Sequence, residues 1–230
     1  MDGLVQQSSS YLIPDGSAHR PFLNRRGALH GIDWIQAAIL EGYGFKSTVG
    51  ALSTPVAGGG SGTVVDLDQP EFGMIIPAGV TIIPLRIAIQ LTTPLLVTDA
   101  DEVEALGFVD VTAATVAAAL DGTWTTTITP TNKRIALANR KTSTCTVKKQ
   151  CTADTTDPTE SIDLFHSIMV ADMNGTPANA LITRHDVLYE PKEKDFIVGP
   201  ASLFIYWGGT VAVSGFMQMD WLELPSTHLQ

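Results

Sequence analysis

The stretch of residues 195–225 near the end of the sequence constrains the fold more than any other part of the chain. Two runs rich in Val, Ile, Phe, Tyr and Trp flank a glycine pair at 208–209, which is typical of a β-hairpin turn. In the second run Met217, Met219 and Trp221 alternate with polar residues, the period of two of a half-buried antiparallel strand. We expect this closing strand to lie in the middle of a sheet, because both of its faces need cover.

Further runs with strand character follow one another from residue 63 onward, with turn signals between them. Helical patterns do not alternate with these runs, so the sequence favours an all-β, antiparallel sandwich or barrel of about eight to ten strands. A bulge is expected at Gly215, and a hairpin between 135–138 and 144–148 with its tip at 139–141. The side chains expected to be mostly buried are Leu85, Ile87, Ile89 and Leu91, which should all face one way along a single strand, together with Trp124, Ile168, Phe204, Tyr206, Met219 and Trp221.

Residues 1–62 have the character of an arm that precedes the body at 63–230. An apolar stripe that includes Trp34, Ile35 and Ile39 predicts one short helix near 32–41. The glycine run that follows, at the end of the arm, is typical of a linker. We expect the arm to pack on a neighbouring subunit, because a short helix needs a surface to lie on.

Charge is segregated along the chain, whose formal net charge is −10. The segment 122–153 contains no acid, and the segment 93–121 contains no base. Two interpretations stay open: both segments are solvated faces, or they are complementary patches that meet between copies. The second interpretation predicts subunit contacts through the basic side chains Lys133, Arg134, Arg140, Lys141, Lys148 and Lys149, opposite Asp99, Asp101, Glu102 and Glu104.

The sequence shows no catalytic or cofactor-binding constellation. The five histidines form neither an HxH pair nor an HExxH motif, so we predict no catalytic, cofactor or metal site. Asp99, Asp101 and Glu102 are acidic enough for calcium, but a solvated loop is the simpler interpretation because the EF-hand pattern is absent. The Cys145–Cys151 spacing fits neither a zinc site nor a CxxC motif, which leaves two free thiols or one disulfide across a short loop.

Several partner and location classes are disfavoured by the composition. A chain this acidic is a poor candidate for wrapping nucleic acid, so weak or no direct binding is expected. No apolar run is long enough to span a bilayer, and the first residues lack the basic start and apolar core of a signal peptide. We therefore expect no membrane span and no secretion through a signal peptide.

The pattern resembles the single jelly-roll coat proteins of icosahedral viruses and phages. The residues that carry the resemblance are 76–85 (Ile-Pro-Ala-Gly-Val-Thr-Ile-Ile-Pro-Leu) and the two closing strands, 199–207 and 215–225. The resemblance implies a jelly-roll sandwich over 63–225 that self-assembles into a capsid shell. It also implies a virion location after assembly in the host cytoplasm, with other copies and other capsid proteins as partners. The chain lacks the long basic arm of small RNA-virus coats.

A second function class is compatible with the same pattern. A trimeric jelly-roll head, such as a phage fibre tip or a TNF-like domain, would use its loops to bind a receptor or glycan. An enzyme is the third class. Discrete trimers would indicate the head, and shells or sheets would indicate the coat protein.

Overall fold

The residues that the structure describes fold into two antiparallel sheets, with one short α-helix and a 3-10 turn at Ser226–His228. The computed structural model describes residues 33–59, 65–94, 100–112, 120–135, 141–153, 158, 161–172, 182–209 and 213–228. The first sheet contains β1 (Gly44–Val49), β2 (Val56–Ala57), β4 (Val80–Pro94), β7 (Thr131–Asn132), β10 (Ile182–Tyr189), β11 (Ile197–Val198) and β13 (Ser214–Pro225). The second contains β3 (Phe72–Ile76), β5 (Ala100–Asp110), β6 (Thr123–Ile128), β8 (Thr146–Ala153), β9 (Ser161–Asp172) and β12 (Ala201–Gly209).

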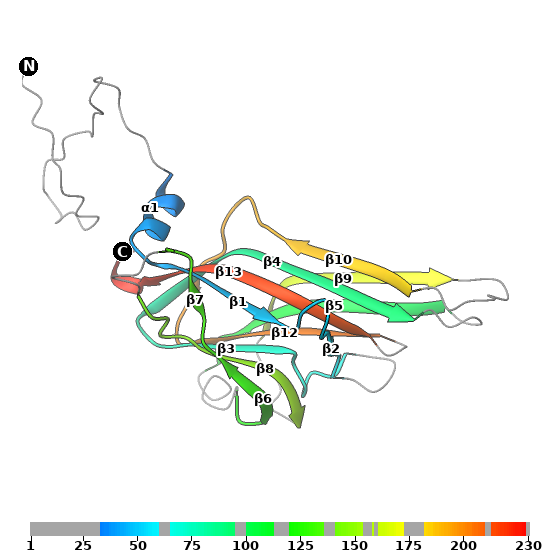
Figure 1. Ribbon diagram of the computed structural model, residues 1–230. Coiled ribbons are helices and arrows are strands. Elements are labelled where there is room, and N and C mark those ends of the chain that lie inside the picture. Colours follow the sequence, from blue (N-terminus) through cyan, green and yellow to red (C-terminus); the bar gives the residue numbers. More distant parts are fainter. Residues whose placement is uncertain are drawn as a thin grey trace, which may run out of the picture.

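The order of strands differs strongly from their order in the chain. The first sheet runs β10-β4-β13-β1-β7, with β11 beside β4 and β2 beside β13. The second runs β6-β8-β3-β12-β5-β9. The two sheets lie face to face in Figure 1. The all-β, antiparallel sandwich expected from the sequence is confirmed, and β13 lies in the interior of its sheet, between β4 and β1.

The hairpin expected at 208–209 is wrong. Gly208 and Gly209 belong to β12, where they pair with Glu104 and Val103 of β5, and β13 belongs to the other sheet. All nine residues of β12 are buried, so this strand needs neighbours on both edges and cover on both faces. The apolar and aromatic residues of this run correctly predicted a buried strand, but they did not identify the strands with which it pairs.

The main hydrophobic core lies between the sheets. Trp207 and Phe72 of the second sheet and Trp221 and Phe45 of the first are all at most 2% exposed. Phe45 and Trp221 stack with ring centroids 6.1 Å apart. Burial of each large apolar side chain contributes about 1.5–3 kcal/mol, so this layer is the main source of cohesion between the sheets.

A β-bulge in β4 changes the direction of one predicted core residue. Trp221 pairs with Pro84 and Asp220 pairs with Arg86, so Leu85 has no partner on β13. The bulge turns Leu85 to the outer face of the first sheet, whereas Ile87 and Ile89 face the core. The expectation that Leu85 shares a face with these isoleucines was therefore wrong, although Leu85 is buried.

Most of the other side chains expected in the core are buried, with two exceptions. Trp124 is only partly buried, on the outer side of the second sheet. Ile168 is 56% exposed, because β9 is an edge strand and Ile168 lies on its outer face. Gly215 pairs regularly with Leu91, so no bulge occurs there. A Cβ at Gly215 would lie 2.5 Å from Leu91 Cδ2, so close strand packing accounts for the glycine.

Helix α1 (Trp34–Leu40) covers the outer face of the first sheet. Asp33 caps its first turn by accepting a hydrogen bond from the Ile35 N–H at 3.3 Å. Ala38 is fully buried against a cluster formed by Ile83, Leu85, Leu222 and Leu224. After the helix, Gly42 adopts φ +87°, a left-handed conformation that favours glycine.

The boundary predicted at residue 62 does not separate arm from body. Strands β1 and β2 precede it, and both pair with β13. The segment 135–148 also differs from its prediction, because β8 pairs with β6 and β3 and residues 136–140 lie outside the described part. The glycine-rich sequence between the helix and residue 62 did not indicate that β1 lies within the first sheet, between β13 and β7.

Candidate functional site

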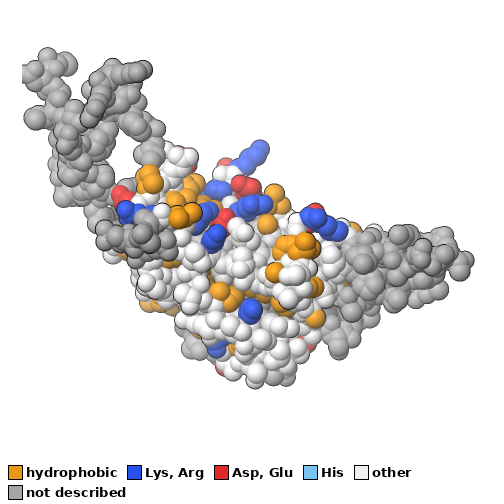
Figure 2. Space-filling view, viewed as in Figure 1, with side chains coloured by type: hydrophobic (Ala, Val, Ile, Leu, Met, Phe, Trp, Pro, Cys, Tyr) orange, Lys and Arg blue, Asp and Glu red, His pale blue; other side chains and the backbone are white. Residues whose placement is uncertain are grey.

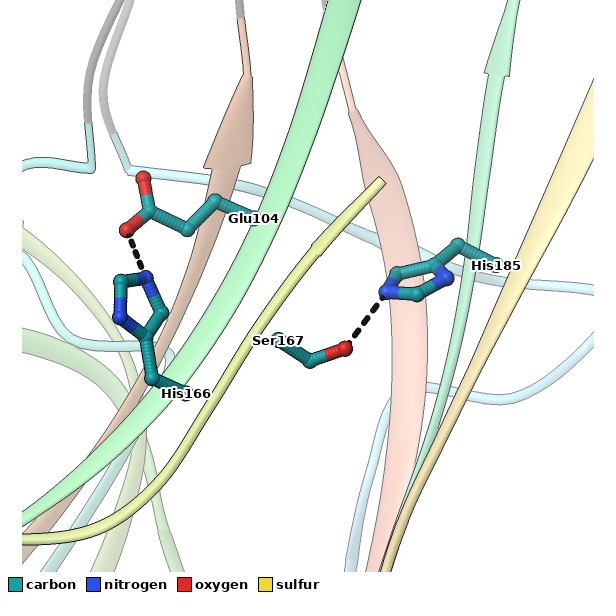
Figure 3. A network of polar contacts seen from close by, with 4 residues as sticks. All are labelled: Glu104, His166, Ser167 and His185. Carbon is teal, nitrogen blue, oxygen red and sulfur yellow. Dashed lines mark hydrogen bonds and ion pairs between the residues drawn. The ribbon is translucent and has the colours of Figure 1, made fainter. Parts of the chain in front are cut away.

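The clearest cluster of polar side chains lies where the two sheets meet at one edge. Figure 3 shows Ser167 of β9 and His185 of β10 pointing toward each other, and His166 on the other side of β9 pointing toward Glu104 of β5. Alternation along β9 explains this split, because successive side chains of a strand point to opposite faces. One pair therefore lies between the sheets, and the other lies on the outer surface.

Ser167 and His185 join the two sheets. The Ser167 hydroxyl and His185 Nε2 are 3.1 Å apart, and both side chains are partly buried. Burial lowers the pKa of His185, and the nearby Asp186 charge opposes that shift. A neutral imidazole with its proton on Nδ1 accepts a hydrogen bond from the serine hydroxyl.

A serine next to a neutral imidazole is the first requirement of a nucleophilic site, but among the described residues the remaining parts of such a site are not assembled around this pair. The carboxylate nearest in sequence, Asp186, is held by Arg184 Nε at 2.7 Å on the exposed face. The geometry fits a clip between β9 and β10 better than a catalytic centre. No sequence motif predicted the Ser167–His185 contact, because the two residues come from strands in different sheets.

His166 and Glu104 form the outer pair. The His166 side chain is 50% exposed and the Glu104 side chain 27% exposed, and their contact is an ion pair when the imidazole is protonated. On the same face of β9, Ile168 and Val170 are both more than half exposed, whereas Ile162, beyond the bulge at Leu164, is exposed on the other face. We refer to Ile168 and Val170 as the β9 apolar stripe. Exposed apolar side chains on an edge strand favour pairing of that strand with another chain.

A small pocket of about 250 Å³ lies at the end of β13. Its walls include Phe45, Val80 and Leu224, together with the buried acid Glu223. Glu223 accepts hydrogen bonds from the Ser143 hydroxyl at 2.6 Å and from both the backbone N–H and the hydroxyl of Thr144 at 2.7 Å. This carboxylate already has its partners, so its role is to fix the segment before β8.

The predicted subunit-interface residues of α1 lie mainly on the chain's own body. Ile35 and Ile39 pack against the cluster under the helix, whereas Trp34 and Leu40 are 41% and 60% exposed. Figure 2 shows hydrophobic side chains gathered around α1, with Lys and Arg side chains beside them. The exposed part of α1 is thus smaller than the stripe that the sequence analysis assigned to a neighbouring subunit.

The predicted basic patch is divided among contacts within the chain. Lys133 Nζ lies 3.1 Å from Asp220 Oδ2, and Lys141 Nζ lies 2.9 Å from the centre of the Tyr43 ring. Lys148 Nζ donates to the Leu120 carbonyl at 3.0 Å. Arg134 is partly buried, and Arg140 lies outside the described residues.

Metal chemistry finds little support in the part of the chain that the structure describes. No group of three or more His, Cys, Asp or Glu side chains in that part is placed to hold an ion. Asp99, one of the three acids considered as calcium ligands, lies outside the described residues. Cys145 and Cys151 are both buried and form no disulfide, and burial, with Glu223 close by, raises the pKa of the Cys145 thiol.

Comparisons with protein-family models, curated proteins and solved structures found no match to this chain. Among the described residues, no helix is long and apolar enough to cross a membrane.

Proposed function

We propose that this chain is a single jelly-roll coat protein that self-assembles into an icosahedral viral shell. The strand order is the observation that supports the proposal most. Eight strands in chain order are β1, β3, β4, β5, β9, β10, β12 and β13. The first pairs with the eighth, the eighth with the third, and the third with the sixth. The second pairs with the seventh, the seventh with the fourth, and the fourth with the fifth.

A jelly roll, with its two four-stranded sheets, is the fold that this pairing pattern supports. The remaining strands are additions to it: β2, β7 and β11 in the first sheet, and the β6–β8 pair at the edge of the second. Jelly rolls occur in viral coats, lectins and cupins, so the fold alone does not select a function. The absence of a metal-ligand group among the described residues weighs against a cupin-type site.

The surface supports a structural role within that fold. The β9 apolar stripe and the exposed side chains of α1 offer apolar area on a chain whose net charge of −10 disfavours random association. The same charge disfavours direct wrapping of a genome, so we propose that other copies, rather than nucleic acid, are the principal partners. Location in the virion follows from this proposal.

The experiment is imaging and mass measurement of the purified full chain. Size-exclusion chromatography with light scattering and negative-stain electron microscopy are expected to show closed particles far above the 24.5 kDa chain mass. A discrete species of three chains would support the trimeric head instead. A monomer at all concentrations and ionic strengths tested would contradict both.

A hydrolase assay tests whether the protein is instead an enzyme. We expect wild type and Ser167→Ala to hydrolyse activated esters equally slowly, because the Ser167–His185 contact is structural. Turnover by the wild type that disappears in Ser167→Ala would contradict the proposal of a non-enzymatic protein.

A further inference from the structure

The second sheet ends in two edge strands that differ in character. Within the described part of the chain, β9 pairs only with β5, and β6 pairs only with β8. Each therefore presents one row of backbone N–H and C=O groups to the outside. Soluble proteins usually protect such edges with charges, prolines or short strands. Strand β9 is twelve residues long and carries the apolar stripe instead.

The backbone of β9 is regular enough to accept a further strand over most of its length. A register shift separates Gly107, which pairs with Phe165, from Phe108, which pairs with Asp163. Leu164 is the extra residue, so beyond it β9 continues without interruption from Phe165 to Asp172. This run is longer than β6, which spans six residues.

The two edges carry charges of opposite sign. Next to β9, strand β5 contributes Glu102 and Glu104, and β9 itself contributes Asp163, which is exposed. Next to β6, strand β8 contributes Lys148 and Lys149, both partly exposed. The acidic and basic groups thus lie at opposite ends of the same sheet, and Figure 1 shows β6 and β9 on opposite sides of the molecule.

The facing of these charges is also compatible. Glu104 lies two residues before Leu106, and Lys148 donates to the carbonyl of Leu120. Both leucines belong to the cluster on the outer face of the second sheet. Glu104 and Lys148 therefore point to the same side of the sheet. In a sheet that continues from one copy to the next, both side chains would lie on its outer face.

Strand direction permits the two edges to pair. All five neighbouring pairs in the order β6-β8-β3-β12-β5-β9 are antiparallel. The two edge strands consequently run in opposite directions. Strand β9 of one copy placed beside β6 of a second copy therefore continues the antiparallel pattern without reversing either subunit.

We propose that β9 of one copy adds to β6 of the next, so that the second sheet continues from subunit to subunit. This inference rests on the proposed self-assembly and names one of its contacts. The contact is head to tail, which closes into a ring when the rotation between copies permits. Pairing of two β9 strands would instead bring Glu102, Glu104 and Asp163 of both copies together, and like charges at a contact disfavour that arrangement.

Charge reversal at one edge at a time tests the contact. Variant one carries Glu102→Lys and Asp163→Lys, and variant two carries Lys148→Glu and Lys149→Glu. Each variant alone is expected to lose at least tenfold in assembly rate measured by light scattering. An equimolar mixture is expected to recover most of the wild-type rate, because the reversed edge of each variant then meets the reversed edge of the other.

Matched controls carry the same change of charge away from both edges. Glu190→Lys with Glu193→Lys, and Lys46→Glu with Lys192→Glu, replace exposed residues and are expected to assemble within twofold of the wild-type rate. Thermal melting establishes that each variant is folded. If a double variant melts early, the single changes Glu102→Lys and Lys149→Glu are used in the same mixing design, with a smaller expected loss of about threefold.

The possible outcomes separate this inference from the proposed function. Wild-type assembly with an unaffected variant two overturns the β9–β6 contact, and a loss confined to variant one indicates β9–β9 pairing. A mixture of folded variants that fails to recover also overturns the contact. Each of these results leaves the coat-protein proposal in place. A wild type that never assembles overturns both.

Discussion

The backbone N–H of Trp207 donates a hydrogen bond to Glu71 Oε2 across 2.9 Å. The other carboxyl oxygen accepts from the backbone N–H of Gly59, so Glu71 ties the segment after β2 to β12. Glu71 is 2% exposed. Burial raises its pKa from 4.5 to about 8, against the opposing effect of the backbone N–H groups of Trp207, Gly59 and Glu71 itself, and the charge of Asp66 raises it further.

Glu71 makes stability fall as pH rises. Its folded-state pKa of about 8 lies above the ordinary value of 4.5, so between these values the folded protein holds a proton that the unfolded chain releases. The contribution is complete below about pH 4.5 and is lost as pH rises through about 8. The expected slope is about 1.4 kcal/mol per pH unit. Glu71→Gln imitates the protonated acid. This variant should reduce the slope of the unfolding free energy against pH, measured by urea denaturation between pH 5 and 8.

The control for that measurement is Glu193→Gln, the same change at an exposed position. It should leave the pH profile of the wild type intact. If Glu71→Gln shows the same slope as the wild type, the carboxyl of Glu71 is ionised in the folded protein and the prediction is wrong.

Lys133 should stabilise the subunit itself. Its contact with Asp220 is mostly buried, with side-chain exposures of 26% and 11%. Lys133→Met keeps the apolar stem but removes the positive charge from the Asp220 carboxylate, which still accepts a hydrogen bond from Gln218 Nε2 at 3.2 Å. We expect a loss of about 1–3 kcal/mol in the free energy of unfolding. The exposed control Lys192→Met should change it by less than about 0.5 kcal/mol; equal losses would exclude the ion pair as the cause.

Helix α1 should be part of the folding unit. Ala38 is fully buried under the helix, whereas Leu40 is 60% exposed two residues later. Ala38→Asp places a charge in an apolar cluster and should destabilise the protein by about 2–4 kcal/mol. Leu40→Asp adds the same charge to the same turn and should cost about 0.5 kcal/mol or less. Similar melting temperatures for the two variants would show that α1 detaches readily from the sheet.

The imidazole of His185 should make the folded protein less stable as pH falls. Burial lowers its pKa below the ordinary value of 6.5, so the unfolded chain binds a proton there before the folded protein does. The stability that the neutral imidazole contributes is therefore present above about pH 6.5 and falls as pH drops through the unfolded pKa. NMR titration should place the pKa of His185 below 6.5 in the wild type. A value above 6.5 would contradict the burial account.

The sequence predicted the local character of strands better than their partners. The alternation of Met217, Met219 and Trp221 correctly predicted a buried strand inside a sheet, because that period depends on one strand alone. The glycine pair at 208–209 suggested a hairpin because the flanking runs are adjacent in sequence. Their separation into different sheets depends on long-range strand pairing, about which a local turn signal carries no information.

Two further errors have similar causes. Leu85 faces outward because a bulge shifts the alternation of β4; the neighbouring Pro84 is compatible with a bulge, but it does not indicate to which face the next side chain turns. Ile168 is exposed because β9 is an edge strand, a property of the sheet and not of the strand. The Ser167–His185 clip and the opposite charges at the two sheet edges were beyond sequence reasoning for the same reason. The segregation of acid and base along the chain was visible, but its position on the sheet was not.

The central claim is that purified copies of this chain assemble by themselves. The most direct measurement is the mass distribution of the full-length wild type by light scattering, with negative-stain images of the same fractions. We expect closed particles of uniform size, together with loss of assembly in each charge-reversal variant and its recovery in their mixture. A wild type that stays at the 24.5 kDa mass of one chain under every condition tested would contradict it.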